Sequence, residues 1–226
     1  MKKQEYTAII PVRAGSRRLK NKNILPFADS NLLIHKIRQL KKIQKIDNIV
    51  VSSDSDEMLE MAKGEGVNTH KRPIEYADEV TKTFNEVVEY IVQDMPGNIM
   101  MWVPCVCPLC DEKIIEQAMY KYEEEVLINK KYDSLATAKL IKEYIWNDDG
   151  PINNDIKNHT KSQDLPNFYI IINGCFISSK INMLNNKFCY GNHPYMYLID
   201  KQYAIDIDDE YDLAIARLIE QKDNIK

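Results

Sequence analysis

A short basic segment near the start of the chain holds side chains suited to binding an anion. Residues 9–23 read IIPVRAGSRRLKNKN and carry five cations around one glycine: Arg13, Arg17, Arg18, Lys20 and Lys22. An arginine can bind two phosphate oxygens at once, and a lysine acts as a point charge. Because neither GxxxxGKS/T nor GxGxxG is present, side chains rather than backbone are the favoured phosphate ligands. The pattern predicts that these side chains bind a triphosphate. The alternative is that the segment forms a solvated turn whose cations face water.

Two carboxylates near the end of the chain could hold a metal ion. Asp206 and Asp208 are two residues apart, so on a strand both would project to one face and could share a hard cation such as Mg²⁺. Such an ion would neutralise phosphate oxygens that the cations do not reach. The alternative is helix capping, with Asp208 as the N-cap. Asp54 follows another apolar run and could assist the metal or an acceptor, or could cap a helix.

The elements between these residues must bring them together. Apolar runs over 6–11, 49–53 and 98–103 alternate with helical periodicity over 32–43, 55–63, 84–94 and 111–122. The alternation predicts an α/β fold with a doubly wound, mostly parallel, Rossmann-like sheet, whose ligands bind at the carboxyl ends of the strands. The basic segment follows the first of these strands.

The pattern changes after residue 131. Residues 133–140 and 168–177 predict two more strands, 203–207 predict a last strand, and 208–221 predict a closing helix. The polar stretch between the first two predicts an arm or insertion at about residues 140–168. We expect residues 1–226 to form a single domain that includes this arm.

The composition excludes some classes of function. A net charge of -4 argues against general nucleic-acid binding, which needs a basic face. No apolar run reaches the roughly 18 residues of a membrane helix, so we expect a cytoplasmic protein without a membrane partner. Five cysteines are an odd number, which favours reduced thiols over disulfides. In CVCPLC at 105–110 no fourth zinc ligand is near, so buried or pocket-lining thiols are favoured over a zinc site.

Several motifs together resemble the CMP-N-acylneuraminate synthetase family of cytidylyltransferases. The first, IIPVRAGSRRLKNKNI, matches that family's N-terminal pattern of Arg, two residues, Ser, five residues and Lys-Asn. The others are IVVSSDSDEMLEMAKGEGV, KRPIEYADE and NGCFI, and AIDIDDEYDLAIA near the end. The resemblance implies a nucleotidyltransferase fold and the transfer of CMP from CTP to a small acidic sugar, a nonulosonic acid such as a sialic acid, with release of pyrophosphate. It also implies a homodimer formed through the arm.

The resemblance further implies roles for individual residues. Catalysis would rest on Arg13, Lys22, Asp206 and Asp208, with Mg²⁺ held by the two carboxylates. The acceptor would meet Asp54, Gln163 and Asn173. Arg72 would lie near the cytosine. The complete nucleotide site would comprise Arg13, Ala14, Gly15, Ser16, Arg17, Lys22, Asn23 and Arg72.

Two departures from that family bear on the acceptor. Where family members carry Arg-Gln-Asp-Leu-Pro and then Tyr-Arg, this chain reads SQDLPNFYI, so Ser162 and Ile170 replace two arginines. An acceptor carboxylate would lack those partners unless Lys139, Lys142 or Lys161 substitutes. The family's Gln-Pro-Thr-Ser-Pro-Leu-Arg is here PCVCPLC, at residues 104–110. The alternatives are therefore a different acceptor, such as another sugar acid, a phosphonate or an alcohol, or a nucleotide-binding protein without turnover.

Overall fold

A seven-stranded sheet forms the centre of the protein, for which a computed structural model describes residues 3–16, 18–78 and 80–223. The strand order is β11-β7-β10-β6-β1-β4-β5. The strands are β1 (Tyr6–Pro11), β4 (Asn48–Ser53), β5 (Asn68–Lys71), β6 (Ile99–Trp102), β7 (Ser134–Ile141), β10 (Phe168–Ser179) and β11 (Pro194–Leu198). Four of the neighbouring pairs are parallel, and β10 runs antiparallel to both β6 and β7. The predicted doubly wound, mostly parallel sheet is confirmed.

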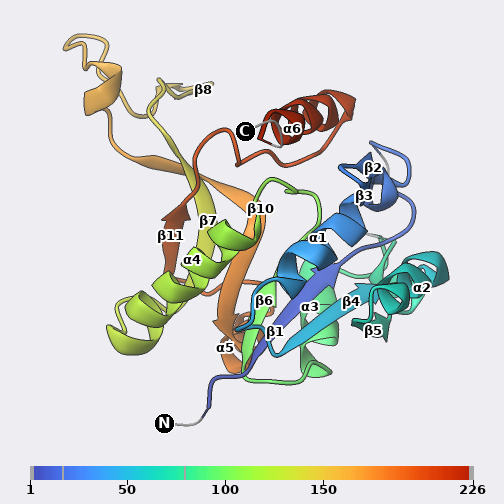
Figure 1. Ribbon diagram of the computed structural model, residues 1–226. Coiled ribbons are helices and arrows are strands. Elements are labelled where there is room, and N and C mark those ends of the chain that lie inside the picture. The colour runs from blue at the N-terminus through green and yellow to red at the C-terminus, as the bar shows by residue number, and fades with distance from the viewer. Residues whose placement is uncertain (1–2, 17, 79, 224–226) are drawn as a thin grey trace.

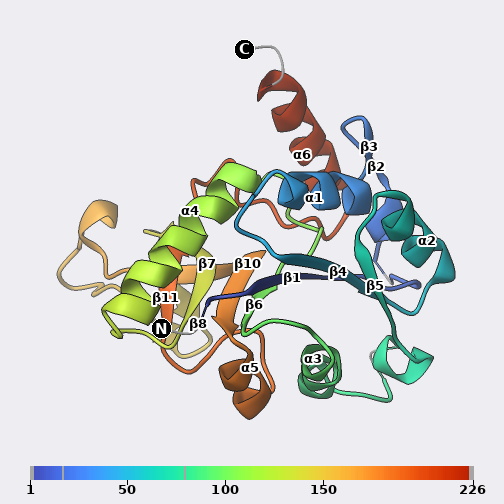
Figure 2. The same cartoon turned by 60° about the horizontal axis from the view of Figure 1, so that its bottom comes forward.

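Helices cover both faces of this sheet, as Figure 2 shows. One face carries α1 (Leu32–Lys41), α2 (Asp56–Gly64), α4 (Glu112–Tyr122) and α6 (Glu210–Asp223), and the other carries α3 (Phe84–Gln93) and α5 (Lys180–Asn186). A separate apolar cluster lies on each face: Leu33, Leu59 and Ile115 belong to one, and Val88 and Met183 to the other. None of the described helices is long and apolar enough to cross a bilayer.

An arm extends from the body between β7 and β10 (Figure 1). It carries a short hairpin, β8 (Trp146–Asn147) with β9 (Gly150–Pro151), and the turn η4 (Ser162–Asp164). The remaining small elements are η1 (Lys22–Ile24), β2 (Pro26–Phe27), β3 (Ser30–Asn31), η2 (Ile74–Tyr76) and the π-helical η3 (Glu123–Ile128).

The predicted strand over 203–207 is wrong, because that segment does not join the sheet. It crosses the loop that follows β6, and the amide of Ile207 donates to the carbonyl of Val106 at 2.8 Å. Ala204 and Ile207 are buried in the cluster beneath α1 and α4. The two buried residues are three positions apart, with partly buried residues between them, which fits an irregular chain and not the period of two of a strand. The sequence reading also missed β11 and α5.

Candidate nucleotide-binding and active site

A cleft of about 800 Å³ opens where β1, β5 and β6 end. The loop after β1 contributes Arg13, Ser16 and Arg18, and η1 contributes Lys22 and Asn23. The connection from β5 to α3 adds further side chains, including Arg72. Parallel strands place their following loops at one edge of a sheet, so residues far apart in the sequence meet there.

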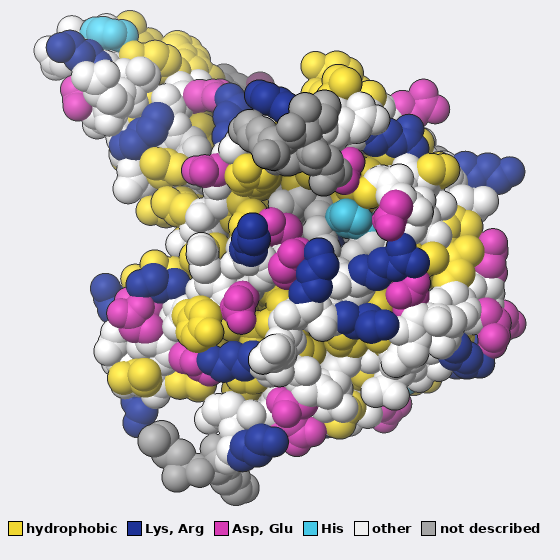
Figure 3. Space-filling model, in the orientation of Figure 1, with side chains coloured by type: hydrophobic (Ala, Val, Ile, Leu, Met, Phe, Trp, Pro, Cys, Tyr) yellow, Lys and Arg dark blue, Asp and Glu magenta, His cyan; other side chains and the backbone are white. Residues whose placement is uncertain are grey.

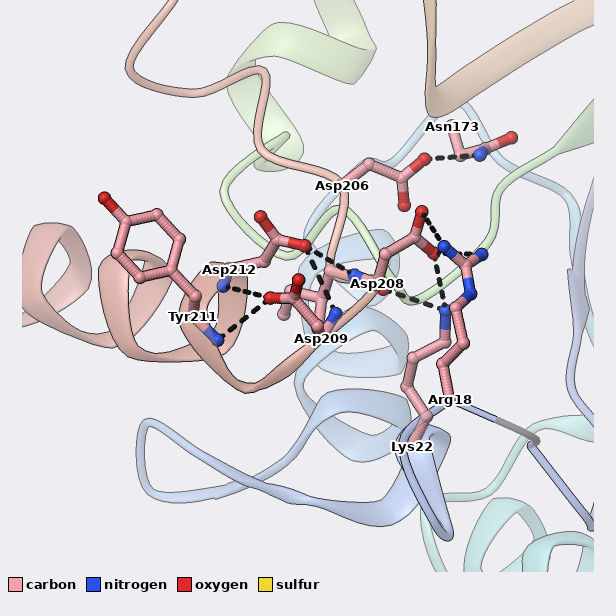
Figure 4. A network of polar contacts seen from close by, with 9 residues as sticks. Arg18, Lys22, Asn173, Asp206, Asp208, Asp209, Tyr211 and Asp212 are labelled. Atoms are coloured by element: carbon pink, nitrogen blue, oxygen red, sulfur yellow. Dashed lines mark hydrogen bonds and ion pairs between the residues drawn. The ribbon is translucent and has the colours of Figure 1, made fainter.

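The end of the chain brings Asp208 to this cleft, where two cations hold its carboxylate (Figure 4). Arg18 binds it with both terminal nitrogens: Nη2 donates to Oδ1 and Nη1 contacts Oδ2, each at 2.9 Å. Lys22 Nζ lies 3.3 Å from Oδ1 and donates to the carbonyl of Ile207 at 2.8 Å. The basic loop and the acidic segment, residues 206–209, lie about 190 residues apart in the sequence and are thus in direct contact.

Asp206 lies beside this network and is half-buried. Asn173 of β10 donates a hydrogen bond to its Oδ2. Burial raises the pKa of Asp206 above its usual value, the hydrogen bond from Asn173 opposes that rise, and the charge of Asp208 adds to it. Asp206 and Asp208 lie near each other (Figure 4), although the strand from which their spacing was interpreted is absent.

Asp209, and not Asp208, caps the start of α6. Asp209 Oδ1 accepts from the amides of Tyr211 and Asp212 at 2.9 and 3.0 Å. Asp212 in turn accepts from the amides of Asp208 and Asp209. The alternative role of Asp208 as N-cap is wrong, because α6 begins at Glu210 and Asp209 precedes it. The cap therefore uses neither the Asp206 nor the Asp208 carboxylate, whose contacts are with Asn173 and with Arg18 and Lys22, respectively.

The basic loop is anchored through its backbone. Gly15 has φ +73°, a left-handed conformation that glycine adopts without a steric penalty. Asn23 is buried and donates to the carbonyl of Arg13 at 3.0 Å. Asp54, an expected acceptor ligand, instead accepts from the amide of Ala14 at 3.0 Å. Neither Asp54 nor Ala14 lines the cleft, whereas Ser16 does; Arg17 lies outside the described residues.

Arg72 lies at the back of the cleft and is only 4% exposed. It donates to the carbonyls of Val12 and Tyr76, while its Nε is buried without a hydrogen-bond partner. Burial lowers the pKa of Arg72 to about 10, so it stays cationic at neutral pH. Arg13 also contacts this region, since its Nη1 reaches the carbonyl of Ala77 at 3.4 Å.

Of the expected acceptor residues, Asn173 lines the cleft and Gln163 does not. Asn173 lies where the pairing register of β10 with β7 shifts, between Ile171 and Phe176. Thr137 of β7 supports this irregularity, because its hydroxyl donates to the carbonyl of Ile172 and accepts from the amide of Cys175. Gln163 lies on η4 of the arm.

The sequence reading missed an aromatic wall opposite the basic loop. Phe176 and Trp102 are directly paired across the neighbouring strands β10 and β6. Phe84, the first residue of α3, meets the rings of Trp102 and Phe188 edge-on, with centroids 6.0 and 5.4 Å away. Tyr190 packs 4.8 Å from Phe188. All five rings line the cleft. The position of Trp102, at the carboxyl end of a predicted strand, was the signal that could have revealed this wall.

The three thiols of residues 105–110 are buried beneath the cleft. Burial raises the pKa of Cys105 to about 12 and that of Cys110 to about 11, so both stay protonated at neutral pH. A fully buried lysine from α1 holds their loop: Lys36 Nζ donates to the carbonyls of Cys107 and Cys110 at 3.1 and 2.6 Å. Because the same loop accepts the amide of Ile207, Lys36 also supports the acidic segment.

Comparison with solved structures shows the same fold. A CMP:2-keto-3-deoxy-manno-octonic acid synthetase complexed with CTP superposes with TM-score 0.68 at 9% identity, covering 97% of this chain and 99% of that one. A 4-diphosphocytidyl-2C-methyl-D-erythritol synthase from Anaerococcus prevotii DSM 20548 gives TM-score 0.67 at 14% identity, covering 96% of each chain. The fold is that of a nucleotidyltransferase.

Sequence comparison then gives the family. A model of the family described as cytidylyltransferase matches residues 7–160, and the chain belongs to that family. It is 26% identical to an N-acylneuraminate cytidylyltransferase of Escherichia coli O18:K1:H7 over 224 residues, covering 96% of this chain but only 52% of that protein. It is 25% identical to a pseudaminic acid cytidylyltransferase of Campylobacter jejuni over 221 residues, covering 93% of this chain and 94% of that protein. The chain thus spans about half the length of the first relative.

Proposed function

We propose that this protein transfers CMP from CTP to a nonulosonic acid and releases pyrophosphate. The observation that carries the proposal is the meeting of Arg13, Lys22 and Asp208 in one cleft, with Asp206 beside it. A triphosphate requires several cations, and a nucleotidyl transfer requires that charge on the α-phosphate be neutralised as the acceptor oxygen attacks. The names of the relatives support this acceptor class.

Each side chain of the site has a defined task in this reaction. Arg13 and Lys22 bind the triphosphate and keep the leaving pyrophosphate in line with the attacking hydroxyl. Ser16 and Asn23 complete the loop around the phosphates, and Arg72 lies toward the base. Positioning and electrostatic stabilisation supply most of the rate in such a transfer, because the protein forms no covalent bond to the substrate.

The two carboxylates fit a magnesium ion. Mg²⁺ prefers hard oxygen ligands and usually takes one or two carboxylates together with substrate phosphates. Asp206 and Asp208 supply such oxygens beside the cations that would hold the phosphates. When bound, the ion supplies positive charge to phosphate oxygens. Arg18 must then release at least one oxygen of Asp208, which it now holds through both guanidinium nitrogens.

Pyrophosphate release with CTP, Mg²⁺ and a panel of acceptors tests this function. We expect N-acetylneuraminate to be at least ~10-fold below the best acceptor in kcat/KM, because Ser162 and Ile170 offer no charge to a carboxylate. Lys142, one possible substitute, instead donates to the carbonyl of Leu165 within the arm. UTP in place of CTP is the control for the nucleotide. If N-acetylneuraminate proves the best acceptor, this interpretation of Ser162 and Ile170 is wrong. If no acceptor in the panel leads to pyrophosphate release, the proposed function is wrong.

We also propose that two copies of the chain associate through the arm. Large apolar side chains are exposed along it and at its base, among them Tyr144, Trp146, Ile156 and Tyr169 (Figure 3). Several large exposed apolar side chains on one projecting segment favour an interaction surface. Light scattering on the purified protein should give about twice the 26.4 kDa of the chain. Trp146→Asp should halve that mass; a monomer in the unaltered protein contradicts the proposal.

A further inference from the structure

Arg18 lines the cleft, but the proposed transfer of CMP gives it no task. It comes from the loop between β1 and η1, and its guanidinium holds both carboxylate oxygens of Asp208, each at 2.9 Å (Figure 4). Two parallel hydrogen bonds of this kind make a stronger and more directional contact than a single one. The guanidinium therefore occupies the two oxygens that Asp208 would offer to a metal ion.

Arg18 is held less firmly in this network than Lys22. The side chain of Lys22 is mostly buried, and its ammonium has a second partner in the carbonyl of Ile207 at 2.8 Å. The side chain of Arg18 is mostly exposed, and within the described part of the chain its guanidinium contacts Asp208 alone. An ion pair between exposed side chains contributes little to stability. Arg18 can therefore leave Asp208 at a small cost, whereas Lys22 stays in place.

The formal charges of the network cancel, because the carboxylates of Asp206 and Asp208 are matched by the cations of Arg18 and Lys22 (Figure 4). A divalent ion added alone would give the site an excess of positive charge. It would also lie a few ångströms from two cations, a distance at which salt screens repulsion only weakly. A triphosphate supplies the missing negative charge. The site therefore favours a metal ion together with the nucleotide over a metal ion alone.

A triphosphate bound by Lys22 would lie within reach of Arg18. Both cations contact the same atom, Oδ1 of Asp208, at 3.3 and 2.9 Å, so their head groups lie side by side. The fork of a guanidinium fits the oxygens of a phosphate as well as those of a carboxylate. Arg18 can therefore exchange the carboxylate for a phosphate without crossing the cleft.

We infer that Arg18 blocks the metal site of the free protein and moves to the triphosphate when CTP binds, which frees Asp208 for Mg²⁺. The inference rests on the proposed function, from which it takes CTP and Mg²⁺. Arg18 then becomes a triphosphate ligand in addition to Arg13 and Lys22. Because one movement serves both ligands, nucleotide and metal strengthen each other's binding, and removal of Arg18 weakens that coupling.

Metal binding to the nucleotide-free protein tests the blocking role. Mn²⁺, which accepts the same oxygen ligands as Mg²⁺, is titrated into the protein, and the unbound ion is measured by its electron paramagnetic resonance signal. Arg18→Ala should bind Mn²⁺ at least ~3-fold more tightly than the unaltered protein, because both oxygens of Asp208 are freed. Arg18→Lys, which keeps the charge without the fork, should lie between the two. Lys20→Ala removes the same charge from an exposed position outside the cleft lining and should leave the affinity unchanged.

Calorimetry of CTP binding in the presence of Mg²⁺, without an acceptor, tests the move to the triphosphate. Arg18→Ala should bind CTP at least ~5-fold more weakly than the unaltered protein, because one phosphate ligand is lost. Lys20→Ala should again change little. The variant Arg18→Ala therefore has opposite effects on the two ligands, tighter for the metal alone and weaker for the nucleotide, which a general loss of structure does not produce.

The outcomes separate this inference from the proposed function, since neither measurement needs turnover. Equal Mn²⁺ affinity of Arg18→Ala and the unaltered protein overturns the blocking role, and equal CTP affinity overturns the move. If Arg18→Ala keeps its gain in Mn²⁺ affinity after Asp208→Asn is added, the metal is not on Asp208 and the inference is wrong. The expected affinities without pyrophosphate release from any acceptor retain the inference and overturn the function. Failure of the unaltered protein to bind CTP overturns both.

Discussion

Replacing Asp208 with asparagine should lower metal-dependent pyrophosphate release by at least ~100-fold, about 2.7 kcal/mol of transition-state stabilisation. Asparagine keeps the size and hydrogen-bonding ability of the side chain but removes the charge that holds a hard cation. Asp208 is partly exposed, and so is its partner Arg18, at 70%. Their ion pair therefore adds little stability, and the melting temperature should change by only a few degrees at most. Asp206→Asn should have the same effect on turnover.

Asp209 provides the matched control, because it is the neighbouring acid that caps α6. Asp209→Ala should cost about 1 kcal/mol of stability, the usual value for a lost N-cap. Its activity per folded molecule should remain near that of the unaltered protein. Thermal unfolding and turnover measured on all three variants decide the assignment. If Asp208→Asn retains magnesium-dependent turnover, the metal role of this residue is wrong.

Lys22→Ala should lower kcat/KM for CTP by at least ~100-fold, and Arg13→Ala should do the same. Lys22 is only 18% exposed, and its ammonium lies between the carbonyl of Ile207 and the carboxylate of Asp208. In the nucleotide complex we expect this ammonium to bind phosphate oxygens while it stays close to the acidic segment.

Lys20→Ala is the control for the lysine variant. It removes the same charge two residues away, but Lys20 is exposed and does not line the cleft. Exposed charges act only weakly at a distance at physiological ionic strength. We therefore expect less than a ~3-fold change for Lys20→Ala in 0.15 M salt. Equal losses for the two lysines would show that the basic loop attracts CTP by its net charge and that the position of Lys22 is unimportant.

The sequence by itself determined the alternating strands and helices of the nucleotide-binding half and the place of the basic loop after β1. These features depend on local periodicity and on neighbouring residue types, so they can be predicted without knowing the tertiary contacts. The spacing of Asp206 and Asp208 brought both residues to attention, but the strand on which that argument relied is absent from the structure.

Only the tertiary structure decided how the segment with Asp206 and Asp208 is held, which acid caps α6, and which aromatic side chains line the cleft. The amide of Ile207 binds the loop after β6 rather than a strand. Asp209 caps α6 because the helix begins at Glu210. The aromatic wall joins Phe84, Trp102, Phe176 and Phe188 from α3, β6, β10 and the residues after α5. Contacts between residues so distant in the sequence produce no periodic pattern in it, because the packing of the whole sheet determines each of them.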